Sequence, residues 1–255
     1  MDAVQSSTSQ FDENRVHVVR FQARQHQIDP APFVVANDVV QVSKSVRNLG
    51  VHLNCDLSMT EHITRTVSSC FGILRQLKMI RHFIPQTSFI SLIVQLILSR
   101  IDYCNVALIG LPKQQIDRLQ LVINAAARLI SNTPYHHDIT PVLSDLHWLR
   151  VPERIEYKIC LLMFKSINGL APCYLSDNIE LVSSQQSRRK LRSSSSMDVL
   201  VPATKTKMGD RSFAVAGANA WNKLPSTLRD SPTLDIFKTR LKTHLFTRSF
   251  IMSST

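Results

Sequence analysis

The sequence predicts a mainly α-helical protein: a short N-terminal β-hairpin is followed by a helical bundle and by a small α-rich region at the C-terminus. Two observations carry this expectation. Apolar residues between positions 58 and 167 recur at alternating intervals of three and four, which is the spacing of one helix face. Alternation typical of strands is concentrated in residues 1–54. A basic, serine-rich stretch at 183–196 then separates the helical part from residues 197–255.

Three segments near the N-terminus have strand character. VHVVRF (16–21) alternates as a strand does, and FVVANDVVQV (33–42) predicts two short strands joined at an Asn37–Asp38 turn. VRNLGVHLN (46–54) is expected to be one further strand, in which Gly50 lets a second backbone approach closely.

The first long helix is predicted to begin at a capping box. Ser58 and Glu61 are spaced so that their side chains can satisfy two backbone amides at the helix start. The residues expected to face the core then repeat at intervals of 4, 3, 4 and 3: Ile63, Val67, Cys70, Leu74 and Leu77.

Two more helices follow. After Pro85 restarts the chain, the second helix is apolar on most sides and is therefore expected to be central. Its apolar residues are Phe89, Leu92, Ile93, Leu96 and Ile97. A turn at 110–112 precedes the third helix, and alanines 125–127 would let a neighbouring helix pack closely against it. The inward residues of the third helix are Ile116, Leu119, Ile123, Ala126 and Ile130.

A fourth helix is expected to open at Pro152, where proline is tolerated, and to end near Gly169. Its inward residues are Ile155, Ile159 and Leu162. Beyond the serine-rich stretch, VLVPATKTK (199–207) predicts a strand or extended piece and GDRSFAVAGANAWNKL (209–224) a helix. SPTLDIFKTRLKTHLF (231–246) predicts a closing amphipathic helix.

The positive charge is concentrated in the C-terminal third. The chain carries 30 Lys and Arg against 19 Asp and Glu, a net of +11. Residues 1–182 hold 17 basic and 15 acidic residues, a net of +2, and residues 183–255 hold 13 and 4, a net of +9. This distribution indicates either attraction to a polyanion or a solvated basic surface that aids solubility, and the sequence leaves both readings open.

The cysteines and the apolar runs indicate in which cellular compartment the protein is expected. Five widely spaced cysteines with no C-x-x-C pair favour a reducing intracellular setting over a disulfide scaffold, and leave nucleus and cytoplasm open. MDAVQSSTSQFDENR, at the N-terminus, lacks the apolar core of a signal peptide. The longest apolar run, FISLIVQLIL, is about half of what a membrane helix needs, so no membrane partner is expected.

Catalytic and metal-binding patterns are scarce. The sequence has no phosphate-cradling G-x-x-x-x-G-K-[ST] motif and no G-x-S-x-G elbow. His136 and His137 are adjacent, so they would point in different directions, and a metal site there is disfavoured. His147, beside Trp148, is expected to serve packing rather than catalysis. No metal or cofactor is therefore expected for this chain.

Charged residues on the predicted helices have simple surface explanations. Glu153 and Glu156, interleaved with Arg154 and Lys158, are expected to form surface ion pairs along one helix.

Three cations of the third helix have two readings. Lys113, Arg118 and Arg128 could contact phosphates, or they could be solvated charges.

The placement of the carboxylates argues against two-metal nucleotide polymerisation by this chain. The chain contains no Asp-Asp pair, whereas polymerases that join nucleotides hold two divalent metals on closely spaced carboxylates.

Four phrases, covering about four fifths of the chain, occur in a characteristic order. They are VRNLGVHLNCDLSMTEHI, SRIDYCNVALIGLPKQQIDRLQLVINAAARLI, ITPVLSDLHWLRVPERIEYKICLLMFKSINGLAPCYLSD and LRSSSSMDVLVPATKTKMGDRSFAVAGANAWNKLPSTLRDSPTLDIFKTRLKTHLF. In them the chain resembles the C-terminal portion of reverse transcriptases of non-LTR retrotransposons, the LINE-like elements of the chicken-repeat, L2 and jockey type.

The resemblance implies roles for segments and residues. Residues 1–54 would be a remnant of the palm with the primer-grip hairpin, and residues 55–182 a thumb-like helical domain. A basic linker at 183–196 and an α-rich region at 197–255 would follow. Three residues would fall on the primer-grip turn that holds the growing DNA end: Asn48, Leu49 and Gly50. Other family landmarks, for which the sequence suggests structure rather than chemistry, are Asp102, Tyr103, Cys104, Asn105, Gly110, Pro112, His147, Trp148, Gly209, Asp210, Arg211, Trp221 and Asn222.

The resemblance also sets the expected function. The family's catalytic aromatic-x-Asp-Asp would lie upstream of residue 16, so the chain is expected to be a truncated RNA-directed DNA polymerase, inactive alone, whose parent would use Mg²⁺. We expect residual, non-specific binding of RNA or an RNA–DNA duplex. The residues expected to contact phosphates are Arg188, Arg189, Lys190 and Arg192, with Lys113, Arg118 and Arg128.

The alternative is a structural helical remnant or a protein-interaction module with no nucleic-acid role. Its exposed apolar helix faces would contact the missing palm and fingers, or another protein.

Overall fold

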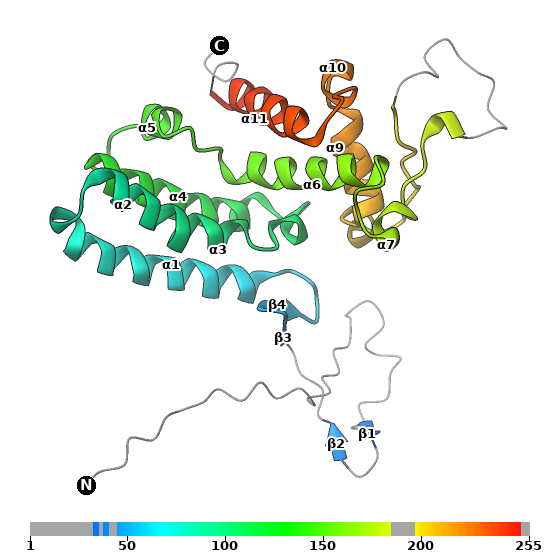
Figure 1. The fold of residues 1–255 in the computed structure, drawn as a ribbon. Helices are drawn as coiled ribbons and strands as arrows, with labels where there is room; N and C mark the ends of the chain where they lie inside the picture. The colour runs from blue at the N-terminus through cyan, green and yellow to red at the C-terminus, as the bar shows by residue number, and fades with distance from the viewer. Residues whose placement is uncertain (1–32, 36–37, 41–44, 185–196, 251–255) are drawn as a thin grey trace, which may run out of the picture. The chain divides into compact units, whose positions relative to one another are not determined.

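The chain is mainly helical, as predicted: in a computed structural model, 66% of the residues that the structure describes are helix and 5% are strand. The structure describes residues 33–35, 38–40, 45–184 and 197–250. These fall into two compact units, one within residues 1–62 and the other within residues 63–255 (Figure 1).

The first unit contains two antiparallel β-hairpins. β1 (Phe33–Val35) pairs with β2 (Asp38–Val40), which confirms the two strands predicted around this turn. β3 (Ser45–Asn48) pairs with β4 (Val51–Asn54). The further strand predicted at 16–21 lies outside the described residues.

The second hairpin corrects the single strand expected over 46–54. Leu49 and Gly50 have φ values of 45° and 82°, so the chain reverses there, and Asn48 pairs with Val51 across the turn. Positive φ at both central residues of a two-residue turn matches the right-handed twist of the flanking strands. A leucine in this conformation is unusual, and for that reason the pattern indicated one strand.

Helix α1 (Thr60–Ile80) begins later than the capping box implied. Met59 has a φ of 57°, which an α-helix does not accommodate, so the helix starts at Thr60. The Ser58 hydroxyl accepts a hydrogen bond from the Thr60 amide at 3.4 Å, two residues on. Beyond the start, the predicted inward face of this helix is buried, with Val67 partly exposed.

The second unit continues with helices separated by short turns. Those before the serine-rich stretch are η2 (Arg81–Phe83), α2 (Gln86–Ile93), the π-helical turn η3 (Val94–Leu98), α3 (Ser99–Asp102), η4 (Asn105–Leu108), α4 (Lys113–Ser131), α5 (Thr140–Asp145), α6 (Val151–Ile167), α7 (Cys173–Ser176) and η5 (Val182–Ser184). The predicted second helix forms without a break from Gln86 to Asp102, with the π-helical turn η3 inside it. Leu96, on that turn, is exposed rather than buried.

The C-terminal region departs more from its predicted elements. Its helices are α8 (Lys207–Asp210), the π-helical turn η6 (Phe213–Gly217), α9 (Ala218–Asn222), α10 (Ser226–Arg229) and α11 (Leu234–Phe250). The single helix expected over 209–224 is thus interrupted, whereas the closing helix forms and runs to Phe250. The predicted extended piece lies beside the chain before the serine-rich stretch, where Val199 and Leu181 form an isolated antiparallel bridge.

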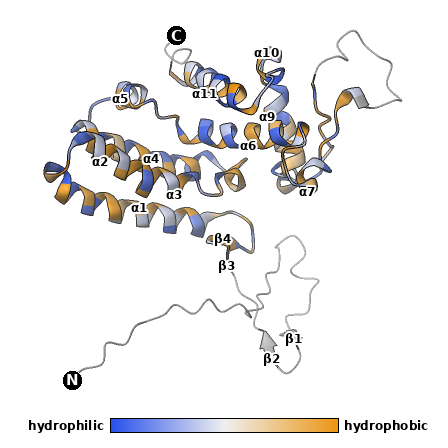
Figure 2. Cartoon of the chain, viewed as in Figure 1, coloured by the Kyte–Doolittle hydropathy of each residue, from blue (hydrophilic) through white to orange (hydrophobic). Residues whose placement is uncertain are grey.

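One hydrophobic core joins α6 to the C-terminal helices, which lie next to it in Figure 1. Phe164 of α6 stacks on Phe237 of α11 with ring centroids 4.4 Å apart, and Trp221 of α9 lies 5.8 Å from Phe237. All three rings are almost fully buried. Gly217 lets η6 pack closely against α6, because a Cβ there would lie 2.6 Å from the sulfur of Met163. The apolar residues of the helices accordingly gather on their inner faces (Figure 2).

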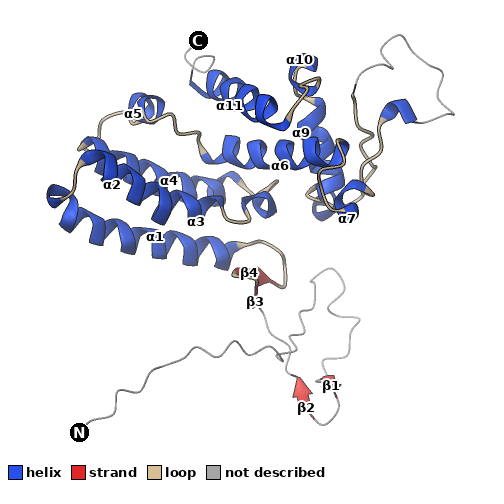
Figure 3. Cartoon of the chain, viewed as in Figure 1, coloured by secondary structure: helices blue, strands red, loops and turns tan. Residues whose placement is uncertain are grey.

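The secondary structure of the described chain is thus dominated by helices, with strands only in the first unit (Figure 3). Among the described helices, none is long and apolar enough to cross a bilayer.

Candidate functional site

The residues predicted to contact nucleic acid are only partly described by the structure. The basic arm, with Arg188, Arg189, Lys190 and Arg192, lies outside the described residues.

The cations of α4 are described, and the structure does not bring them together. Lys113 and Arg128 are fifteen residues apart on one helix, which at about 1.5 Å per residue separates them by about 22 Å. Arg118 donates hydrogen bonds to the Thr64 hydroxyl at 2.9 Å and to the Gln115 side chain at 3.1 Å. Its guanidinium therefore ties α4 to α1.

Arg128 is also engaged within the fold. It donates to the backbone carbonyl of His137 at 3.0 Å and to that of Pro134 at 3.4 Å. Its guanidinium carbon lies 5.4 Å from the centre of the Tyr135 ring. These contacts hold the loop after α4, whereas Lys113 is exposed at the start of that helix.

The three residues matched to the primer grip lie together at the tip of the β3–β4 hairpin. Asn48, Leu49 and Gly50 are all exposed, and the Leu49 side chain is 85% exposed. The tip of this tight turn therefore presents an apolar side chain at the protein surface.

The histidines show no metal-binding arrangement. The rings of His136 and His137 are 4.7 Å apart at the surface, and no group of three potential ligands occurs among the described residues. His147 is exposed and has a φ of 53°, while its neighbour Trp148 is buried. The packing role predicted for this pair thus belongs mainly to Trp148.

The acidic and basic residues of α6 make different ion pairs from those predicted. Glu156 binds both terminal nitrogens of Arg248 on α11, one of them at 2.9 Å. These bonds raise the pKa of Arg248 above its ordinary value. Arg154 pairs with Asp102 at 2.7 Å. The expected pairs along α6 are therefore wrong, because Arg154 and Glu156 bind partners on other helices instead.

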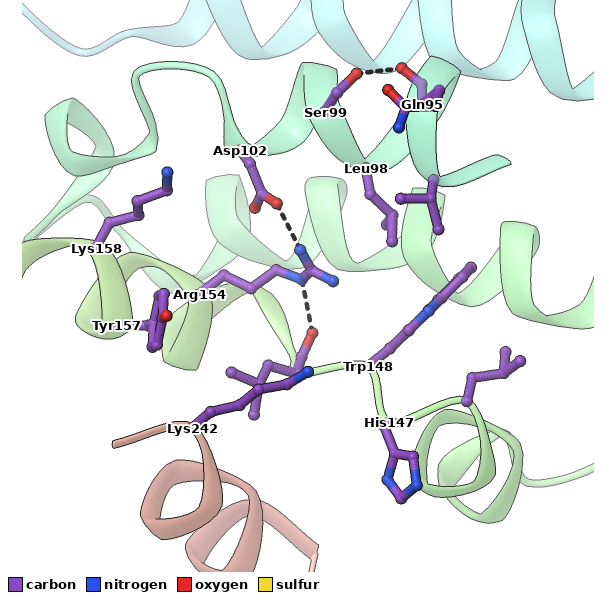
Figure 4. A pocket seen from close by; sticks show the side chains of 13 residues that line it. Gln95, Leu98, Ser99, Asp102, His147, Trp148, Arg154, Tyr157, Lys158 and Lys242 are labelled. Atoms are coloured by element: carbon purple, nitrogen blue, oxygen red, sulfur yellow. Dashed lines mark hydrogen bonds and ion pairs between the residues drawn. The ribbon is translucent and has the colours of Figure 1, made fainter. Parts of the chain in front are cut away.

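A cavity of about 590 Å³ opens beside the Arg154–Asp102 pair (Figure 4). Its walls come from η3 and α3, from the chain before α6, from α6 and from α11. Its lining residues are Val94, Gln95, Leu98, Ser99, Asp102, Leu146, His147, Trp148, Leu149, Arg154, Tyr157, Lys158 and Lys242. We call it the α6–α11 cavity.

The Arg154 side chain is fixed in one wall of this cavity. Its Nε donates to the Leu149 carbonyl at 2.9 Å and its Nη1 to an Asp102 oxygen at 2.7 Å (Figure 4). The other Asp102 oxygen accepts a longer bond, 3.4 Å, from the side chain of buried Asn105. The carboxylate of Asp102 is thus held in a hydrogen-bond network with α6 and with the neighbouring η4.

Two lysines add uncompensated charge to the same cavity. Lys158 comes from α6 and Lys242 from α11; both are exposed, and neither has an ion pair within the part of the chain that the structure describes. With Arg154 offset by Asp102, the lining carries a net charge of about +2 when His147 is neutral. Tyr157 lies in the same lining, and burial raises the pKa of its hydroxyl. The sequence alone did not indicate this cluster, because Lys242 is far from the others along the chain.

Two residues after the serine-rich stretch, Trp221 and Asn222, make structural contacts that the sequence did not predict. Trp221 donates its indole N–H to the Met197 carbonyl at 2.7 Å. Asn222 both donates to the Val199 carbonyl, at 2.8 Å, and accepts from its amide, at 2.9 Å. Thus α9 holds the extended segment by bonds that mimic strand pairing.

Arg211 joins the C-terminal region to the turn before α4. It donates to the carbonyls of Ile109 at 3.0 Å and Ala107 at 3.1 Å. Its stem crosses Gly110, where φ is +69° and a Cβ would lie 2.7 Å from the Arg211 Cγ. Partial burial lowers the pKa of the guanidinium.

The geometry therefore defines a helical protein with a basic cavity and an exposed hairpin tip. No family model, curated protein or solved structure compared with the chain matches it.

Proposed function

We propose that this chain is the primer-grip, thumb and post-thumb portion of a reverse transcriptase of the non-LTR retrotransposon type. Its proposed activity is binding of RNA or an RNA–DNA duplex through phosphates, without reading the base sequence. The particular element and its RNA are left open.

One observation carries the proposal: an exposed hairpin tip at 48–50 is followed along the chain by a helical unit. That order is the one which the resemblance implies for a primer grip and a thumb. The turn residues are those matched to the primer grip, and Asp102, Asn105 and Arg211 make the structural contacts that landmarks of such a fold would need.

The charge distribution supports binding of a polyanion. The chain has a net charge of +11, and Lys158 and Lys242 place two of its positive charges beside one cavity. Cations that contact phosphates displace condensed counterions, so affinity of this kind falls as salt rises.

The experiment is equilibrium binding of the purified chain to a fluorescently labelled RNA–DNA duplex over a range of salt concentrations. We expect affinity to fall steeply between about 50 and 200 mM salt and to be similar for unrelated duplex sequences. A variant with Arg188, Arg189, Lys190 and Arg192 changed to Ala is expected to bind more weakly. Its matched control replaces four other basic residues by Ala: Arg75, Lys78, Lys205 and Lys207.

A second candidate function rests on a separate observation. Met79, Ile80 and Phe83, where α1 passes into η2, are exposed, and Phe83 is 77% exposed. Clustered apolar side chains at a surface favour contact with another protein. The interaction module predicted as the alternative would use this patch. It would be preferred if the folded chain bound no nucleic acid at low salt and self-associated or bound a partner only with this patch intact.

A further inference from the structure

We propose that the α6–α11 cavity binds a phosphate group of a nucleic-acid strand, with Lys158 and Lys242 as the phosphate-contacting residues. This inference rests on the proposed function, because it gives the polyanion a docking place on the described part of the chain. It differs from the sites that the sequence suggested, which were the basic arm and the cations of α4.

The first step is that two separate helices deliver the charge. Lys158 follows Arg154 by four residues, so both lie on one face of α6. Lys242 comes from α11, which packs against α6 through the Phe164–Phe237 stack. That core fixes the two helices relative to each other. The backbone positions of Lys158 and Lys242 are therefore both held at the edge of one cavity.

The second step is that the charge of these lysines is not cancelled locally. Among the described residues that line the cavity, Asp102 is the one carboxylate, and Arg154 and Asn105 already bind its two oxygens. The acidic residue Glu156 lines a different cavity, where Arg248 pairs with it. On α11, Lys238 is paired with Asp235, so these two charges largely cancel and change the net charge near the cavity little.

The third step is that the cavity provides both room and a fixed guanidinium. A volume of about 590 Å³ lies within the range of roughly 300–1,000 Å³ that holds small ligands, so a phosphate with its sugar fits. Arg154 has two of its nitrogens bound, and its Nη2 makes no hydrogen bond within the described chain. In Figure 4 this nitrogen points toward the Trp148 side.

The lining also suits a nucleotide better than a bare ion. Tyr157 and Trp148 supply apolar surface next to the cations, and aromatic side chains interleaved with basic ones are typical of surfaces that bind single strands. A lysine ammonium binds phosphate as a point charge and imposes no planar geometry, so two of them can follow a backbone that crosses the cavity. A free phosphate or pyrophosphate has the same chemistry, and the test separates this source from a nucleic-acid strand.

The test uses the full chain with Lys158→Gln and Lys242→Gln combined. The matched control combines Lys78→Gln and Lys207→Gln, which removes the same charge from two exposed lysines elsewhere. Both variants change only exposed side chains, and circular dichroism with thermal melting checks that each folds as the parent does. The probes are the labelled RNA–DNA duplex, a labelled single-stranded RNA, and inorganic pyrophosphate, whose binding is measured directly by isothermal titration calorimetry.

We expect the cavity variant to bind the duplex or the single strand about tenfold more weakly than the control at low salt. The slope of log affinity against log salt should decrease by about 2, because each of the two lysines would otherwise neutralise one phosphate. If the chain binds nucleic acid and both variants bind equally well, the cavity proposal is overturned and the proposed function stands.

The remaining outcomes show whether the bound phosphate belongs to a nucleic-acid strand or is a free phosphate. If the chain binds pyrophosphate but neither nucleic acid, and binding needs the two lysines, the phosphate site stands with a free phosphate as its ligand and the proposed function fails. If the chain binds none of the probes, both proposals are overturned.

Discussion

The contact between Arg211 and the turn at Gly110 is expected to stabilise the fold by a specific amount. The Arg211→Ala substitution removes two hydrogen bonds, 3.0 and 3.1 Å long, from a charged donor to the carbonyls of Ile109 and Ala107. Hydrogen bonds to charged groups contribute about 1.5–3 kcal/mol each, and partial exposure reduces this by about half. The expected loss is therefore about 2 kcal/mol of unfolding free energy.

Two further substitutions test the geometry of this contact. Arg211→Lys keeps the charge but cannot donate to both carbonyls in the same fork, so it should cost about 1 kcal/mol. Gly110→Ala should cost at least about 1 kcal/mol, because its φ of +69° is unfavourable for a residue with a Cβ. It should cost more when Arg211 is present, because the new Cβ would lie 2.7 Å from the arginine Cγ.

The assay is urea denaturation followed by tryptophan fluorescence, on the parent, the three single variants and the Gly110→Ala/Arg211→Ala double variant. In a chain of this size, 2 kcal/mol corresponds to a fall in Tm of about 4–8 °C. The contact would be refuted if Arg211→Ala cost less than about 0.5 kcal/mol. It would also be refuted if Gly110→Ala cost the same with and without Arg211.

Three further predictions follow from the core and from ionisable groups. Trp221→Ala should cost about 4 kcal/mol by urea denaturation, because it leaves a cavity beside the stacked rings of Phe164 and Phe237; a loss under 1 kcal/mol would place the ring outside the core. In alkylation by iodoacetamide followed by intact mass, exposed Cys104 and Cys173 should react in the native chain, whereas Cys70 and Cys160 should react only on unfolding. Burial raises the pKa of Cys70 to about 11 and that of Cys160 further, so rapid native labelling of either would contradict their burial. Burial of His62 lowers its pKa below 6.5, and the positive charge of His52 nearby lowers it further. The unfolded chain therefore binds the proton more readily than the folded chain does. Its contribution to stability is present above pH 6.5 and is lost as the pH falls through the lower folded value; His62→Gln should flatten that part of the stability–pH curve, and an unchanged curve would contradict the assignment.

The helices with regular periodicity could be predicted from the sequence, because burial of one face depends on local spacing. The inward faces predicted for α1 and α4 are buried, apart from partly exposed Val67 and Ile116. Gly169 has the positive φ expected of a residue just after a helix. These successes all follow from residues close together in the chain.

The features that could not be predicted depend on unusual backbone or on distant partners. Leu49 adopts the conformation that a turn needs, although leucine rarely does, so the pattern of the hairpin indicated one strand. The partners of Arg154 and Glu156 lie about fifty and ninety residues away, so spacing within α6 favoured the wrong pairs. The α6–α11 cavity is hidden from the sequence for the same reason, since α11 must fold back onto α6 before Lys242 lies near Lys158.

The measurement that tests the central claim most directly is the salt dependence of binding between the purified chain and a labelled RNA–DNA duplex. The account predicts binding at low salt that weakens by at least tenfold between about 50 and 200 mM salt, with little preference among duplex sequences. A well-folded sample that binds no duplex at low salt would contradict it.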